Sequence, residues 1–261
     1  MRHRIFWGIV IILLGVLFLL EGVFKINAWG FFWPLLLIAA GIWVLLTRLA
    51  PVQEMTTEEF SLPLEGASSA KIVLKHGAGV IALRAMQSKS DVLRGTFVGG
   101  VHANVQREND HVHIVLRSAA DFRQIFPRLP HGQGLDWDIS LNKDIPLKLK
   151  METGASENRL DLSGLEVTEL KIETGASATE IDLPKSAGFC RVHVSSGAAS
   201  LVVRVPAKVA AKIHVEGLVS KEIDQQRFPA TGAYFQSPDY ESAKNKVEIH
   251  VESGVGSVEI K

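Results

Sequence analysis

Apolar and polar residues alternate along a series of short segments in the second part of the chain. Three copies of one pattern stand out, Leu147–Gly154, Leu170–Gly175 and Val192–Gly197, in which every second residue is apolar until a small polar residue and a glycine follow. A more distant copy ends at Gly254, and a weaker one ends at Gly77. Strict alternation is typical of a strand with one buried face, so each copy predicts a strand that reaches its glycine.

A second short alternating segment follows each of the three central glycines, which predicts a unit of strand, tight corner and strand. Glycine permits a positive φ or a close backbone approach, so we expect Gly77, Gly154, Gly175, Gly197 and Gly254 to form the corners. One unit of about 20 residues cannot bury its apolar face alone, so neighbouring units must stack. The predicted fold is all-β, a β-solenoid or a stack of β-hairpins. Its expected core is Leu149, Met151, Leu162, Ile172, Leu183, Val194 and Val205.

The first 50 residues follow another pattern, with two apolar runs of 16 residues that begin at Ile5 and Phe31. A membrane-spanning helix needs about 20 residues, so both runs must extend into their flanks. No small-residue cleavage site follows the first run, which argues against a cleaved signal peptide. The predicted organisation is a transmembrane helical hairpin at 1–50 (helices at about 5–24 and 31–48), a linker at 51–66 and an all-β repeat domain at 67–261. Residues 118–135 and 221–245 break the repeat and are expected to be excursions from the stack.

Two spans return the chain to the side of the membrane on which it starts. Arg2 and Arg4 precede the first span and Arg48 follows the second, whereas the turn carries only Lys25. Because positive charges favour the cytoplasmic side, we predict a multi-pass membrane protein with a cytoplasmic β domain.

Small residues recur along the predicted helices. Gly8, Gly15 and Gly22 are seven residues apart and therefore lie along one helix face, while Gly41 lies in the second helix. Short side chains let helices approach closely in a bilayer, so this face is a candidate for packing within the hairpin or against a partner's helix.

Charge argues against one class of function. Of the 28 basic and 28 acidic residues, four and one lie in residues 1–50, which leaves 24 and 27 in the remainder, a balance of −3. Nucleic-acid binding normally needs a basic patch, so DNA and RNA are not expected partners. The single cysteine, Cys190, lies in an alternating segment and is expected to be a buried, unreactive thiol.

Candidate catalytic or metal-binding groups are few. No nucleophile elbow, phosphate-binding loop or zinc-protease motif is present. The carboxylate pairs Asp136 with Asp138 and Asp161 with Asp182 leave a β-helical carbohydrate-active enzyme as a distant alternative. A further set, His102, His111 and His113, could suggest a metal site, but no cysteine accompanies it and a polar sheet face is favoured. We therefore expect no enzyme activity, no cofactor and no metal.

A row of polar residues emerges on counting four positions back from the repeat glycines. It contains Lys150, Lys171, His193 and His250, which we call the outer ladder. Two positions back lie Glu152, Glu173, Ser195 and Glu252, so each rung of a stack would place an acidic or polar group beside the ladder. Solubility is the simpler explanation of this face, and a partner-docking surface is the functional one.

Two regions together resemble a known family. Phe6-Trp7-Gly8 and the segment Phe32–Ile38 resemble the membrane region of LiaI/LiaF-like bacterial proteins. The Asp136-Trp137-Asp138 motif, the repeated Glu-Thr-Gly-Ala-Ser and the segment Gly254–Ile260 resemble the toastrack-type domain that often follows it. The resemblance implies a bacterial membrane protein of the cell-envelope stress response, in a family that regulates sensor kinases or associates with other envelope-stress proteins. LiaF itself has four helices, so its kinase inhibition is not carried over to this single hairpin.

Two functions from different classes remain open. The favoured one is a membrane-anchored interaction or regulatory protein, with the lipid bilayer and other membrane proteins as partners. The alternative is a β-solenoid scaffold that assembles into homo-oligomers, which unprotected end rungs would favour.

Overall fold

The structure is a computed structural model that describes residue 37 and residues 56–87, 89–119, 135–186 and 188–261. The chain divides into two compact units, Met1–Val52 and Gln53–Lys261. Of the expected transmembrane helices only residue 37, which is helical, is described, and Gly8, Gly15, Gly22 and Gly41 lie outside the described residues. Within the described part, no helix combines the length and apolar character that a membrane crossing requires.

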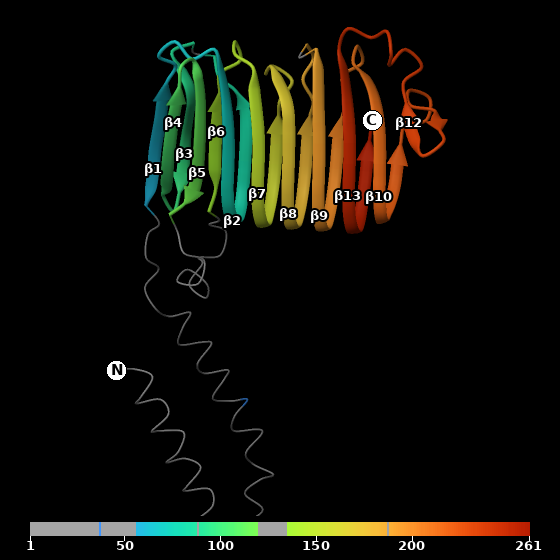
Figure 1. Ribbon diagram of the computed structural model, residues 1–261. Coiled ribbons are helices and arrows are strands. Elements are labelled where there is room, and N and C mark those ends of the chain that lie inside the picture. Colours follow the sequence, from blue (N-terminus) through green and yellow to red (C-terminus); the bar gives the residue numbers. More distant parts are fainter. Residues whose placement is uncertain (1–36, 38–55, 88, 120–134, 187) are drawn as a thin grey trace, which may run out of the picture. The chain divides into compact units, whose positions relative to one another are not determined.

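Thirteen strands form one sheet in the second unit (Figure 1). They are β1 (Thr57–Pro63), β2 (Ser69–Ala85), β3 (Asp91–Val98), β4 (Val101–Glu108), β5 (His111–Ser118), β6 (Trp137–Leu141), β7 (Leu147–Asp161), β8 (Val167–Asp182), β9 (Phe189–Arg204), β10 (Ala210–Ile223), β11 (Ala230–Thr231), β12 (Tyr234–Gln236) and β13 (Lys246–Ile260).

Six long strands, each of 14 to 17 residues, are the rungs of a stack and lie in the order β2, β7, β8, β9, β13, β10. All neighbouring rungs are parallel, and equivalent positions lie side by side, so that Met151 lies beside Ile172 and Ile172 beside Val194; the register shifts only at Leu147/Lys148 and at Gly217/Leu218. Each rung has a first arm before its glycine and a second arm after it. Figure 1 shows the two arms in two layers that join along one edge. The predicted stack of repeated units is confirmed.

One hydrophobic core lies between the arms because apolar residues alternate in both. All seven core residues expected from the sequence are buried and belong to a single cluster, including Leu149 and Met151 of a first arm and Leu183 and Val205 after second arms. Burial of an aliphatic side chain stabilises the fold by roughly 1.5–3 kcal/mol, so the repeated apolar positions are its main source of stability.

The repeat glycines act through close approach rather than through a left-handed backbone. None of Gly77, Gly154, Gly175, Gly197 and Gly254 has a positive φ, so that part of the expectation is wrong. A Cβ on Gly154 would lie 2.4 Å from the carbonyl oxygen of Gly77, and one on Gly254 would lie 2.5 Å from that of Gly197. The rungs therefore touch through their backbones at the corner, and a side chain there would hold them apart.

The stack divides in two at its β2 end. The first arm of β2 pairs with β5, which pairs with β4, whereas the second arm pairs with β6, followed by β3 and β1. Residues 51–66 are therefore not simply a linker, because β1 lies within them and pairs with β3 over Thr57–Pro63. Trp137 and Phe97 fill the space between the two branches, with ring centroids 5.1 Å apart.

Chain order and spatial order differ at the other end of the stack. The last strand, β13, lies between β9 and β10 and pairs in parallel with both. The expected excursion at 221–245 is shorter, since β10 continues to Ile223. The residues beyond it form β11 and β12, and β12 pairs with β10 at Lys212 and Ile213. Phe228 from this segment is fully buried in the core, as expected for a capping residue.

Candidate functional site

The parallel register assembles the outer ladder as the sequence predicts. Lys150 lies beside Lys171, Lys171 beside His193 and His193 beside His250. The next rung adds His214, which lies beside His250. All five side chains alternate with buried residues and therefore point away from the core.

An acidic column runs parallel to the outer ladder, two residues closer to the corner. Its members on successive rungs are Glu152, Glu173, Ser195, Glu252 and Glu216. On β2, the cation Lys75 lies in this column beside Glu152. Basic side chains of the outer ladder thus lie next to carboxylates on four of its five rungs, and next to Ser195 on β9.

Ion pairs connect the lysine end of this surface into a chain. Lys75 Nζ lies 2.5 Å from Glu152, Lys150 lies 2.8 Å from Glu152 and 3.3 Å from Glu173, and Lys171 lies 2.7 Å from Glu173. The hydrogen bond from Lys150, followed by that from Lys75, lowers the pKa of Glu152, while Lys171 does the same most strongly for Glu173. Both carboxylates therefore stay charged to lower pH than free glutamate.

Histidines replace lysines on the last three rungs. His250 Nε2 lies 2.9 Å from Glu252, and His214 Nε2 lies 2.6 Å from Glu216. The His193 and His250 rings stack with their centroids 5.3 Å apart. This end of the outer ladder differs chemically from the lysine end, since imidazole nitrogens carry lone pairs and ammonium groups do not.

A shallow groove of about 840 Å³ follows the corner beside the acidic column. Its lining includes Glu152, Glu173, Thr174, Ser195 and Gly197 from three successive rungs. The groove is polar and follows the stacking direction, so an extended polar or charged segment matches its shape better than a compact apolar ligand does.

Polar groups also lie inside the corner, which the sequence did not suggest. Asn158 is fully buried and donates hydrogen bonds to Thr179 (3.0 Å) and Ser156 (3.1 Å). His76, 3% exposed, lies against the Trp137 ring at 4.6 Å, and neither of its ring nitrogens has a hydrogen-bond partner among the described residues. Burial lowers the pKa of His76, so its ring is neutral at pH 7.

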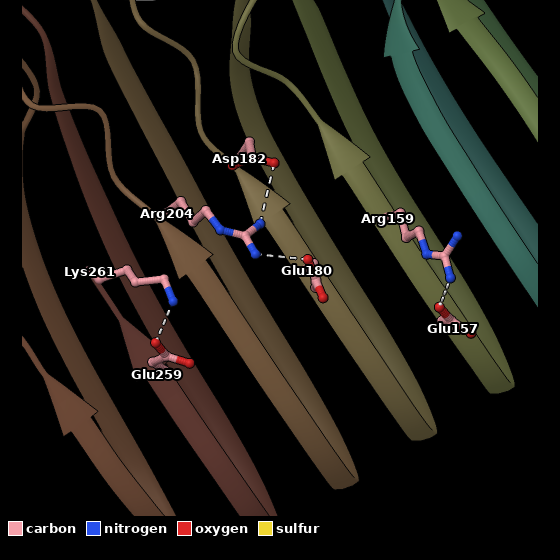
Figure 2. Close-up of polar contacts among 7 residues, drawn as sticks. All are labelled: Glu157, Arg159, Glu180, Asp182, Arg204, Glu259 and Lys261. Carbon is pink, nitrogen blue, oxygen red and sulfur yellow. Dashed lines mark hydrogen bonds and ion pairs between the residues drawn. The ribbon is translucent and has the colours of Figure 1, made fainter.

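The outward face of the second arms carries a separate set of ion pairs. Figure 2 shows Arg204 of β9 reaching Glu180 at 2.9 Å and Asp182 at 3.5 Å, both on β8. In the same view Arg159 pairs with Glu157, and Lys261 pairs with Glu259. These contacts join rungs or neighbours within a rung, and no histidine takes part in them.

The carboxylates considered for catalysis are held by neighbouring groups. Asp136 accepts a hydrogen bond from the Val80 N–H at 3.3 Å, and Asp138 pairs with Arg84 at 3.1 Å. Asp161 accepts hydrogen bonds from the Ser163 N–H and hydroxyl.

The histidines singled out first do not converge. His102 lies opposite Arg117 on the β4–β5 ladder, whereas His113 lies opposite Gln106, near the other end of the same ladder. Cys190 is buried as expected, and burial raises the pKa of its thiol to about 12.

The sequence pattern missed His214. Its rung has one residue fewer before the corner, because Gly217 lies beside Ser253 and the register shifts directly after it. Counting four back from Gly217 reaches Ile213 instead. The Glu216-Gly217 pair was the available signal, since it repeats the acid and glycine of the other copies at a shorter spacing.

Two protein families match the chain in sequence. The LiaF transmembrane domain matches residues 6–85, and the N-terminal domain of toast_rack matches residues 51–204. No curated protein matches the chain.

The fold also occurs in a solved structure. A candidate cell adhesion protein from Clostridium sporogenes ATCC 15579 is similar with a TM-score of 0.71 at 20% identity, over 79% of this chain and 99% of that one. A candidate adhesin from Bacteroides fragilis NCTC 9343 aligns over 81% of this chain and 99% of that one, at 9% identity and a TM-score of only 0.29. The first of these likenesses shows a shared fold.

Proposed function

Since this chain belongs to the toast_rack family and its residues 6–85 match the LiaF transmembrane domain, we propose that it is a membrane-anchored, non-enzymatic protein that binds other membrane proteins in the bacterial response to cell-envelope stress. The match to the LiaF transmembrane domain supports the membrane anchoring in this proposal. The partners we propose are a sensor kinase or another envelope-stress protein, following the resemblance of the two regions to LiaI/LiaF-like proteins.

The observation that carries this proposal is the regular polar and charged surface made by the outer ladder and the acidic column. Exposed ion pairs contribute only about 0.2–1 kcal/mol each to stability, so this regular arrangement adds little to folding. The sheet nevertheless holds the charges at fixed spacing over five rungs. Fixed charges with a defined pattern favour specific, oriented association with a partner of complementary charge.

A self-assembling scaffold is the second candidate, and the edge of β10 bears on it. Among the described strands, β12 covers this edge only at Lys212 and Ile213, which leaves most of β10 unpaired on that side. Leu218 is 84% exposed near the corner. The Lys221 ammonium, however, donates a hydrogen bond to the Val215 carbonyl at 2.6 Å, and lysine on an edge strand hinders pairing with another chain. This protection favours the interaction role over assembly.

Crosslinking of the full-length protein in native membranes, followed by identification of the attached proteins, tests the proposal. One variant changes the outer ladder, with Lys150, Lys171, His193 and His250 all replaced by serine. A matched control replaces four cations of the second arms by serine: Arg84, Arg159, Arg204 and Lys261. A third variant, Gly8→Leu with Gly15→Leu, changes the small-residue face of the predicted first helix.

The expected result is that specific partners are recovered with the native protein and the control but are lost with the outer-ladder variant. Loss with the glycine variant instead would assign recognition to the transmembrane hairpin. If no variant changes recovery and the purified protein forms filaments by itself, the scaffold function replaces the one proposed here. Hydrolysis of a polysaccharide by the purified protein would contradict the non-enzymatic assignment.

A further inference from the structure

Three histidines form a row where β9, β13 and β10 meet on the outer ladder. The rings of His193 and His250 are nearly parallel, with an angle of 5° and a centroid distance of 5.3 Å. The rings of His250 and His214 are 5.1 Å apart at 20°. The three residues occupy one position on neighbouring parallel rungs, so the sheet itself fixes this spacing.

Carboxylates lie within reach of the row. Glu252 Oε1 lies 2.9 Å from His250 Nε2, and Glu216 Oε1 lies 2.6 Å from His214 Nε2. One ligand atom from each of His193, His250 and Glu252 lies within 4.8 Å of the others, and no second group of three such residues is as close in the part of the chain that the structure describes. Nitrogen and oxygen donors therefore converge from two rungs.

His214 places a further pair of donor atoms next to this group. Its Nδ1 lies 3.0 Å from the Ala233 carbonyl oxygen, which can only accept a hydrogen bond, so Nδ1 carries the proton. In the neutral ring the lone pair is then on Nε2, which faces the Glu216 oxygen. Two lone pairs at 2.6 Å repel each other unless a proton or a cation lies between them. Histidines that bind metals commonly donate their other N–H to a backbone carbonyl in this way.

We propose that this histidine cluster binds one divalent transition-metal ion of the zinc class. The ligands are His193, His250 and Glu252, and His214 with Glu216 forms a second donor pair on the adjoining rung. Imidazole and carboxylate suit zinc, which takes ligands at about 2.0–2.2 Å in a tetrahedron and hence at roughly 3.4 Å from one another. The donor atoms must approach from up to 4.8 Å, which side-chain rotation allows because all three side chains are partly exposed.

Three protein ligands leave a fourth position for water or for a group from another molecule. The lysine end of the outer ladder cannot extend the site, because a protonated ammonium has no lone pair. The inference does not rest on the proposed function, since metal binding is measured with the purified protein alone.

Titration of the full-length protein in detergent with Zn²⁺ tests the site. The affinity tag must lack histidine, and Mg²⁺ is the control ion because it prefers oxygen ligands in an octahedron. We expect one Zn²⁺ per chain by calorimetry, an increase in the unfolding temperature with Zn²⁺, and visible absorption bands of tetrahedral cobalt when Co²⁺ replaces Zn²⁺.

His250→Gln should weaken Zn²⁺ binding by at least about tenfold and remove the tetrahedral cobalt bands, since it deletes the central ligand. His102→Gln, an exposed histidine on β4, is the matched control and should leave binding unchanged. Glu252→Gln provides a second test that keeps the size of the side chain. The proposal fails if Zn²⁺ does not bind, if binding survives both His250→Gln and Glu252→Gln, or if only His102→Gln abolishes it.

Discussion

Alanine substitutions along the glycine column separate close backbone contact from backbone flexibility. Gly77 and Gly154 occupy equivalent corners on the neighbouring rungs β2 and β7, and neither has a positive φ. A Cβ on Gly154 would lie 2.4 Å from the Gly77 carbonyl oxygen, whereas a Cβ on Gly77 would have no heavy atom within 4 Å. Gly154→Ala therefore introduces a clash that Gly77→Ala avoids.

The size of the effect follows from these distances. Ordinary contact begins at 3.4 Å, so the corner of β7 must move by 1.0 Å (3.4 − 2.4) from β2, against hydrogen bonds to the rungs on both sides. Overpacking of this kind costs about 1–3 kcal/mol. Gly77→Ala should instead stabilise by about 0.4–1 kcal/mol, because alanine restricts the unfolded chain. For a domain of this size 1 kcal/mol shifts Tm by about 2–4 °C.

The assay is thermal unfolding of the full-length protein in detergent, followed by far-ultraviolet circular dichroism. We expect Tm to fall by about 2–12 °C for Gly154→Ala and to stay level or rise by up to about 4 °C for Gly77→Ala. Gly175→Ala should fall between them, since its Cβ would lie 2.9 Å from the Gly154 oxygen. Equal Tm values for the first two variants would refute the explanation by close approach.

Three further predictions concern charge, the thiol and topology. Hydrogen bonds from lysine lower the pKa of Glu152 and Glu173 in the folded protein. The stability that these two carboxylates contribute is therefore present above their ordinary pKa of 4.5 and is lost as the pH falls through the lower native values. In the double variant Glu152→Gln with Glu173→Gln, the free energy of unfolding should depend less on pH below 4.5 than in the native protein. The Cys190 thiol, with a pKa of about 12, should react with a disulfide reagent at pH 8 only after unfolding in denaturant, and fast labelling of the folded protein would contradict its burial. A reporter fused after Lys261 should be active only if it functions in the cytoplasm, and activity of a reporter that requires the outer side would reverse the predicted orientation.

The stack could be predicted from sequence because one pattern repeats with its glycines in place. Counting back from Gly154, Gly175, Gly197 and Gly254 places Lys150, Lys171, His193 and His250 in one column, and the parallel register preserves that column. The buried faces followed from the same counting. The alternation of apolar and polar residues within a rung and the similar sequences of successive rungs can both be read from the sequence alone.

The order of the rungs could not be predicted in this way. The segment Val247–Gly254 has the same alternation as its neighbours, so its pattern fits beside any rung, and nothing local indicates that it lies between β9 and β10. Strand β1 lies in the predicted linker, and its own sequence does not indicate that it pairs with β3. Both misses concern pairing between segments whose own patterns do not specify a partner.

The histidine cluster shows the same limit on a smaller scale. His193 and His250 could be aligned by counting, but His214 joins them only through a one-residue shift at Gly217. Its carbonyl partner, Ala233, comes from the irregular segment that follows β10. Such a site depends on which strands are neighbours in the sheet, and the sequence shows the residues but not the pairing of the strands.

The position of β13 determines the order in which the last strands can pair during synthesis. Strand β10 leaves the ribosome before β13 does, yet it has no place on the stack until β13 has paired with β9. A nascent chain interrupted before Lys246 would leave the edge of β9 open and β10 undocked, exposing a long row of unpaired backbone groups and the apolar face beside it. Such a chain is prone to aggregation and proteolysis, so the edges of β9 and β10 are protected only after β13 has been made.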